Sequence, residues 1–181
     1  MKQINNWKYI KGHVNWLANF EEDFNYRSLP YARENFNDLD QINKWQVQGH
    51  NPRTGLMYDL RHERQPMLTQ MLIDYVKKQG LEHIGVSYYK MLPGDNLPNH
   101  SDLYKKYITL YDLISRRNNI IRYVFFPEDR KSGHLIEVDG QLIDWKAGDY
   151  VAWRYDVPHL GANLGTEDRF TIQVTGVLSE N

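Results

Sequence analysis

The stretch IIRYVFFPEDRKSGHLIEVDGQLIDWKAGDYVAWR, residues 120 to 154, indicates how this chain folds. Its apolar and polar side chains alternate, and β-branched and aromatic residues dominate, which is typical of β-strands. Asp139-Gly140 has the chemistry of a two-residue hairpin turn, and Gly148-Asp149 marks another turn. We therefore predict four short strands in this stretch, at 120–126, 134–138, 141–145 and 149–154.

Two further segments of the same character lie outside this stretch. We predict strands at 84–92, which ends before a turn at Pro93-Gly94, and at 169–177. Six short strands after a partly helical front half favour a mainly β fold, an antiparallel sandwich or jelly roll with helices packed outside. Such a cupin-like barrel offers a cavity between its sheets.

The front part of the chain, residues 1–83, is predicted to be mixed and partly helical and to pack on this core. An amphipathic helix is expected over 66–79, because apolar residues recur there at helical spacing, namely Leu68, Met71, Leu72, Tyr75 and Val76. A weaker pattern favours a short helix over 13–25. The aromatic residues of the first 60 positions are interpreted as a cover for one side of the β core, with a ligand-binding box as the alternative.

Composition narrows the classes of function. The 181 residues are 41% hydrophobic and 25% charged, which fits one globular domain, 1–181, with its core at 84–178. A net charge of −1 argues against a general nucleic-acid or anionic-membrane binder. Cysteine is absent, so any metal ligands must be histidines or carboxylates. No window approaches the length of a membrane span, and we expect a cytoplasmic protein of undetermined oligomeric state.

His100, Asp102 and His159 are candidate metal ligands. On an extended segment, positions i and i+2 point to the same side, so His100 and Asp102 can reach one ion while Ser101 points away. The chain between Asp102 and His159 is long enough for the intervening strands to cross the sheets and return. Two imidazoles and a carboxylate suit Fe(II), although they could also hold Zn, Mn or Ni. A coincidental H-x-D is the alternative in a chain with seven histidines.

Arg169 is the candidate anion-binding residue. Strand alternation puts Arg169, Thr171 and Gln173 on one face. If this face points inward, the guanidinium needs an anion, because an unpaired buried charge costs roughly 3–5 kcal/mol. A carboxylate would match its planar fork. If the face points to solvent, Arg169 would pair with Asp168 or Glu167.

Together these residues resemble a known family, the 2-oxoglutarate- and Fe(II)-dependent oxygenases. In that family a double-stranded β-helix carries an H-x-D…H triad. An arginine downstream of the second histidine, often followed two positions on by Ser or Thr, binds the distal carboxylate of 2-oxoglutarate. His100-Ser101-Asp102, His159 and Arg169-Phe170-Thr171 match this pattern in order and spacing.

The resemblance covers residues 84–178. The run from Trp145 to Asp149, before Pro158-His159 and with Asn163 beyond, is similar to aspartyl/asparaginyl hydroxylase-like members, and there is some likeness to prolyl hydroxylase-like members. Some of the former lack the carboxylate ligand that this chain retains. Residues 1–83 resemble nothing that we can name.

The resemblance implies a reaction and a role for each matching residue. His100, Asp102 and His159 would hold Fe(II), and Arg169, helped by Thr171, would bind the C5 carboxylate of 2-oxoglutarate. With O2 as the other cosubstrate, 2-oxoglutarate would be decarboxylated to succinate while a substrate is hydroxylated. The protein would position the reactants and exclude water.

Three more residues have weaker assignments. Tyr89 and Arg122 are candidates for contacts to the C1 carboxylate of 2-oxoglutarate or to the substrate, and packing or a surface ion pair is the alternative for each. Trp153 either lines the cavity or belongs to the core.

The substrate is left open between a protein or peptide side chain and a small metabolite, ahead of nucleic acid. A basic segment after the triad could steer an anionic substrate to the cavity mouth or could be plain solvated surface; its charged residues are Lys105, Lys106, Arg116 and Arg117. Two other functions stay open. The first is a cupin-like metal enzyme that does not use 2-oxoglutarate, and the second is a metal-free binding module.

Overall fold

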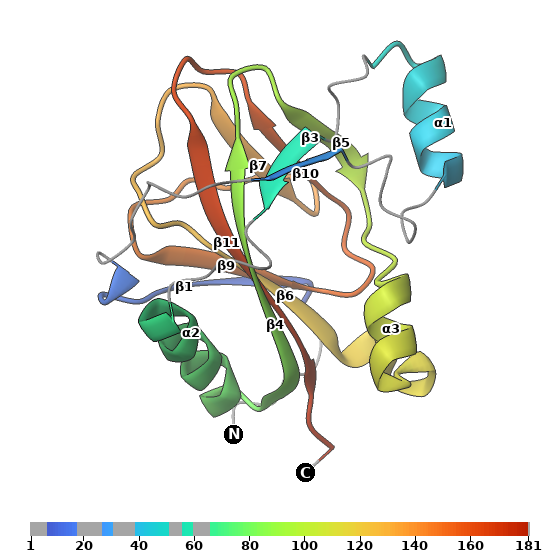
Figure 1. The fold of residues 1–181 in the computed structure, drawn as a ribbon, viewed down its shortest axis with the longest axis vertical. Coiled ribbons are helices and arrows are strands. Elements are labelled where there is room, and N and C mark those ends of the chain that lie inside the picture. The colour runs from blue at the N-terminus through green and yellow to red at the C-terminus, as the bar shows by residue number, and fades with distance from the viewer. Residues whose placement is uncertain (1–6, 18–26, 31–38, 51–55, 60–65, 181) are drawn as a thin grey trace.

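The computed structural model describes residues 7–17, 27–30, 39–50, 56–59 and 66–180. Their strands form two antiparallel sheets (Figure 1). The larger sheet has the order β1-β9-β6-β11-β4-β3-β2, with bounds Tyr9–His13, Asp149–Arg154, Ile120–Phe125, Arg169–Leu178, Leu81–Met91, Leu56–Asp59 and Arg27–Pro30. The smaller sheet has the order β5-β10-β7-β8, with bounds Asn96–His100, His159–Asn163, His134–Val138 and Gln141–Leu142.

These sheets confirm the mainly β jelly-roll fold. Each of the six predicted strands has a counterpart, and β7 and β9 agree with the prediction at both ends. The hairpin turn is also confirmed, because Asp139 and Gly140 both have the positive φ angles, 52° and 74°, that a primed two-residue turn requires. The predicted strand at 141–145 was too long, since β8 contains two residues.

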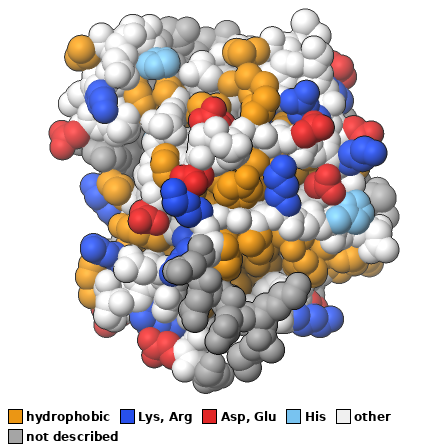
Figure 2. Space-filling view, turned by 180° about the vertical axis from the view of Figure 1, so that it is seen from behind, with side chains coloured by type: hydrophobic (Ala, Val, Ile, Leu, Met, Phe, Trp, Pro, Cys, Tyr) orange, Lys and Arg blue, Asp and Glu red, His pale blue; other side chains and the backbone are white. Residues whose placement is uncertain are grey.

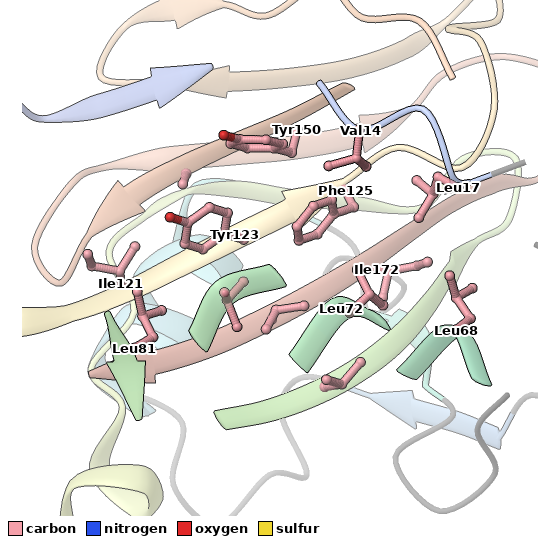
Figure 3. Close-up of a cluster of buried hydrophobic side chains, with 14 of the residues drawn as sticks. Val14, Leu17, Leu68, Leu72, Leu81, Ile121, Tyr123, Phe125, Tyr150 and Ile172 are labelled. Carbon is pink, nitrogen blue, oxygen red and sulfur yellow. The ribbon is translucent and has the colours of Figure 1, made fainter. Parts of the chain in front are cut away.

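Helices cover the outside of the larger sheet and one end of the barrel (Figure 1). The predicted helix forms α2 over Pro66–Lys78 and ends before Gly80, whose φ of 89° favours glycine. It buries its apolar stripe against the outer face of β4, β6 and β11, as Figure 3 shows for Leu68, Leu72 and Ile172. The apolar stripe of α2 is therefore part of the hydrophobic core. The other helices are α1 (Leu39–Val47), α3 (Lys105–Tyr111) and the 3-10 helix η3 (Ile114–Asn119).

The inner face of the larger sheet points into the space between the sheets. Alternation along β6 and β9 separates outer side chains such as Tyr123 and Ala152 from inner ones such as Val124 and Trp153. The inner side chains pack on residues of the smaller sheet, including Ile136, in a second hydrophobic cluster. This inner space holds the candidate metal-ligating and anion-binding residues.

Several elements were not predicted. Residues 9–13 form β1, which pairs with β9, so the expected helix over 13–25 is wrong at its start; residues 18–25 lie outside the described part. The front part also supplies β2 and β3, which extend the larger sheet through β4. Strands β5 and β10 were missed as well. Pairing between strands, rather than local propensity, holds these segments extended.

On the face in Figure 2, side chains of Lys and Arg lie interspersed with those of Asp and Glu, which fits a net charge of −1. Among the described residues, no helix has both the length and the apolar character that crossing a membrane would require.

Candidate metal centre

His100, Asp102 and His159 come together at the end of the smaller sheet. One ligand atom from each residue lies within 4.8 Å of the others. His100 ends β5 and His159 begins β10, and the two residues are direct partners in the antiparallel pair. Ser101 points away, as expected, and its hydroxyl donates a hydrogen bond to the Asp156 carbonyl. The structure therefore brings together the three residues that the spacing had singled out.

Both histidines have the tautomer that metal binding needs. Nδ1 of His100 lies 2.8 Å from the Pro98 carbonyl oxygen, and Nδ1 of His159 lies 3.0 Å from that of Val157. A carbonyl oxygen can only accept, so each Nδ1 must carry the proton. The lone pair of each ring is then on Nε2, which faces Asp102 at 3.8 Å for His100 and 3.7 Å for His159.

The electrostatics of the triad favour the charge states of metal ligands. Burial alone would raise the pKa of Asp102, but Arg122, followed by His159 and His100, lowers it well below its usual range. Burial, followed by the proximity of His100, lowers the pKa of His159 to about 4. Near neutral pH the site therefore presents a carboxylate and a neutral imidazole, as a divalent cation requires. This donor set fits a metal site.

Arg169 lies on the inner face of the larger sheet, next to β10, the strand that begins with His159. The residue is 4% exposed, and its Nη1 donates to Met91 Sδ at 3.0 Å. A Cβ at position 161 would lie 3.3 Å from Nη1, so the guanidinium lies against Gly161, two residues along β10 from His159. Burial lowers the pKa of Arg169 to about 10. The inward alternative for this strand face is therefore correct.

The described part of the chain supplies Arg169 with no ion pair. The charge of Glu128 raises the pKa of Arg169, but the Glu128 carboxylate is paired with Lys131 at 2.8 Å. The sequence neighbours of Arg169 are engaged elsewhere, Asp168 with Lys90 and Glu167 with Lys131. Among the described residues no carboxylate forms an ion pair with Arg169, and its buried Nε has no hydrogen-bond partner. Trp145 packs against the guanidinium, with its ring centroid 5.7 Å from Cζ. A buried cation in such surroundings is the expected partner of an anionic ligand.

The other predicted site residues share this inner face. Thr171 lies two residues along β11 from Arg169 and is buried. It pairs in register with Tyr89, which is also buried. Arg122 lies on β6 and reaches Asp102, with 3.4 Å between Nη2 and Oδ2. The roles of Thr171, Tyr89 and Arg122 toward a cosubstrate stay predictions.

Two tryptophans also contact the triad. Trp153 is buried, with its ring centroid 4.7 Å from that of His159, so it is both a core residue and a wall of the site. Trp45 of α1 meets His100 edge-on at 5.7 Å. The contact of α1 was missed, because nothing in a short polar helix indicates what its single buried tryptophan will touch.

The basic segment after the triad is only partly available to a ligand. It forms α3 and η3, where Arg116 pairs with Glu82 at 2.7 Å and Glu180 at 3.1 Å. Arg117 lies over the ring of Tyr155. Arg116 is thus a structural residue, while Lys105 is exposed.

Comparisons with known proteins bear on the fold. No family model matches the sequence. No curated protein matches it either. A prolyl-4-hydroxylase from Pseudomonas putida superposes with a TM-score of 0.51 at 12% identity, over 85% of this chain and 92% of that one. A 2OG-Fe(II) oxygenase family oxidoreductase from Burkholderia pseudomallei gives 0.50 at 13% identity, over 77% and 78%.

A cupin domain is also among the similar structures. The Cnp3 cupin domain of Schizosaccharomyces pombe matches at a TM-score of 0.42 and 7% identity, over 67% of this chain and 64% of that one. At identities of 12 and 13%, the likeness to the hydroxylase and the oxygenase concerns the fold alone, a double-stranded β-helix.

Proposed function

We propose that this chain is a non-haem Fe(II) oxygenase that couples decarboxylation of 2-oxoglutarate to succinate with hydroxylation of a substrate. One observation carries the proposal: a buried arginine that forms no ion pair with a described carboxylate lies beside the strand that begins with His159, a candidate metal ligand. A metal triad alone would suit many enzymes. The triad together with Arg169 suits a ligand that binds a metal at one end and presents a carboxylate at the other.

The residues have separate tasks in this proposal. His100, Asp102 and His159 would hold Fe(II), which with 2-oxoglutarate and O2 supplies the oxidising chemistry. Arg169 would bind the C5 carboxylate with its fork, and Thr171, on the same inner face, would donate its hydroxyl. Trp153 and Trp45 would exclude water from the histidine rings.

For the substrate we propose a protein side chain or a small metabolite. Exposed Lys105 could attract an anionic group toward the site, but Arg116 is already neutralised by two carboxylates. The face in Figure 2 mixes both signs of charge, which gives no support to a nucleic-acid substrate there.

An anaerobic titration tests the proposal directly. Fe(II)-loaded protein would be titrated with 2-oxoglutarate while the weak visible charge-transfer band of the chelate is followed. We expect the band in the wild type, and for Arg169→Met we expect the band to need far more 2-oxoglutarate. Arg116→Met, which removes a partly buried arginine from a different ion pair, is the matched control and should behave as the wild type.

The other outcomes point to other functions. If metal binds but no band forms, a cupin-like metal enzyme that does not use 2-oxoglutarate replaces the proposal. If neither metal nor 2-oxoglutarate binds, the triad serves no metal and a binding module is the better description.

A further inference from the structure

We infer that Arg122 is a positioning residue that fixes the Asp102 carboxylate and thereby determines how Asp102 binds a metal ion. The inference rests on the proposed metal site, because Asp102 matters here as one of its ligands. In this inference Arg122 contacts the metal-ligating residue Asp102 and not the C1 carboxylate of 2-oxoglutarate.

The two oxygens of Asp102 have different surroundings. Oδ1 faces Nε2 of His100 at 3.8 Å. Oδ2 faces Nε2 of His159 at 3.7 Å and is also 3.4 Å from Nη2 of Arg122. A guanidinium beside one oxygen draws electron density to it, which leaves the other oxygen as the natural metal ligand.

Asp102 lacks the support that the two histidines have. His100 and His159 are held by strand pairing and by Nδ1 hydrogen bonds to carbonyl oxygens. Asp102 follows the end of β5 and belongs to neither a strand nor a helix. Its carboxylate therefore depends on side-chain contacts for its orientation.

Arg122 is itself held rigidly enough to give that support. It lies inside β6, paired with Trp153 of β9 on one side and Thr175 of β11 on the other. Nη1 donates to Oε1 of Gln173, whose side chain shares the inner face. Only 16% of the Arg122 side chain is exposed.

Arg122 also contacts the same loop at a second point. Its Cζ lies over the ring of Tyr104 at 5.0 Å from the centroid, and Tyr104 is two residues after Asp102. One guanidinium thus holds the loop by charge at Asp102 and by a cation–π contact at Tyr104. A buried ion pair is weak evidence of a role in stability alone. Both contacts of Arg122 are instead made to the loop that carries the candidate ligand Asp102.

The inference predicts a metal-specific effect of substitution. Without the guanidinium, Oδ2 becomes free to turn toward the metal, so both the affinity and the coordination geometry should change. Loss of a group that orients a metal ligand typically lowers metal affinity by roughly 10- to 100-fold. Arg122→Lys keeps the charge but not the fork, so it should recover part of the affinity.

The test measures Co(II) binding and the unfolding of the metal-free protein. Co(II) reports affinity through its visible absorption and ligand geometry through the band shape. For Arg122→Gln we expect a Kd raised by 10-fold or more with an altered band shape, and for Arg122→Lys an intermediate Kd. Arg116→Gln is the matched control, because it also loses carboxylate pairs, with Glu82 and Glu180, but not beside the triad. It should lower the melting temperature and leave Co(II) binding unchanged.

Two results would overturn the inference in distinguishable ways. If Arg122→Gln binds Co(II) with wild-type affinity and spectrum, Arg122 does not position Asp102, while the metal site itself stands. If the wild type binds no Co(II), the metal site and the inference both fail. Should Arg122→Gln not fold, Arg122→Lys carries the test alone, because it also removes the guanidinium fork; a wild-type Co(II) affinity and spectrum there would equally count against the inference.

Discussion

His100 and His159 face each other across the β5–β10 pair, with ring centroids 4.5 Å apart and direct strand register. Two imidazoles at this separation can offer their Nε2 lone pairs to one shared cation. The hydrogen bonds of both Nδ1 atoms to carbonyls fix the rings before any ion arrives. The site is thus preorganised by the smaller sheet.

Removal of one imidazole should abolish high-affinity metal binding. His159→Ala takes away one of three protein ligands, so its cost should exceed the roughly 10- to 100-fold typical for losing a group that only orients a ligand. Metal binding can be measured by isothermal titration with Mn(II) or Co(II) under anaerobic conditions. His13→Ala is the control, since His13 is exposed and paired with Asp149 outside the triad. Equal affinities of His159→Ala and wild type would contradict the assignment of the ligand.

Arg169 should contribute to 2-oxoglutarate binding but not to the stability of the ligand-free protein. In the absence of ligand, Arg169→Met replaces a buried guanidinium that forms no ion pair in the described chain by an apolar side chain. We expect the free energy of unfolding in urea to stay equal or to rise by on the order of 1 kcal/mol or more. Addition of 2-oxoglutarate with metal should stabilise the wild type by about 2.7 kcal/mol at 100 times Kd, and the variant far less. A large loss of stability in the ligand-free variant would show instead that Arg169 is part of the scaffold.

Much of this arrangement could be predicted from local sequence. Asp139-Gly140 predicted the hairpin, and the spacing from Leu68 to Val76 predicted α2. Strand alternation placed Arg169 and Thr171 on one face. These features depend on neighbours in sequence, where propensity and periodicity act.

The missed features depend on contacts between distant segments. Strand β5, with Pro98 in a polar run, is extended because it pairs with β10. In the sequence Arg116 belongs to a basic segment, but in the fold it pairs with Glu82 and Glu180, which are distant in sequence. Alternation could not say which face of β11 is inner, since both faces of that strand are buried.

His134 should make the stability of the protein depend on pH. It is buried, and its Nε2 donates to the Glu167 carbonyl at 3.2 Å. Burial, helped by Arg169 and Lys131, lowers its pKa below the ordinary value. A histidine with a lowered pKa contributes stability that is present above its unfolded-state pKa, near 6.5, and is lost as pH falls below that value, because the unfolded chain takes up the proton first.

Urea unfolding in excess chelator between pH 8 and pH 5 checks this expectation. The wild type should lose stability as pH falls through this range, and His134→Gln should lose less. Part of the dependence should remain in the variant, because the pKa of His159 is shifted in the same direction, to about 4. Parallel stability curves for the two proteins would rule out a contribution from His134.

Gly161 should be required by the anion site but not by the metal site. A Cβ at this position would lie 3.3 Å from Nη1 of Arg169, closer than comfortable contact, so Gly161→Ala should displace the guanidinium by a few tenths of an ångström. We expect 2-oxoglutarate to bind about tenfold more weakly, which corresponds to about 1.4 kcal/mol, while the Kd for Co(II) stays unchanged. Gly85→Ala, in β4 with no atom within 4 Å of the added methyl group, is the matched control and should affect neither ligand. If Gly161→Ala weakened metal and 2-oxoglutarate equally, the substitution would be acting through the bulge beside His159 rather than through Arg169.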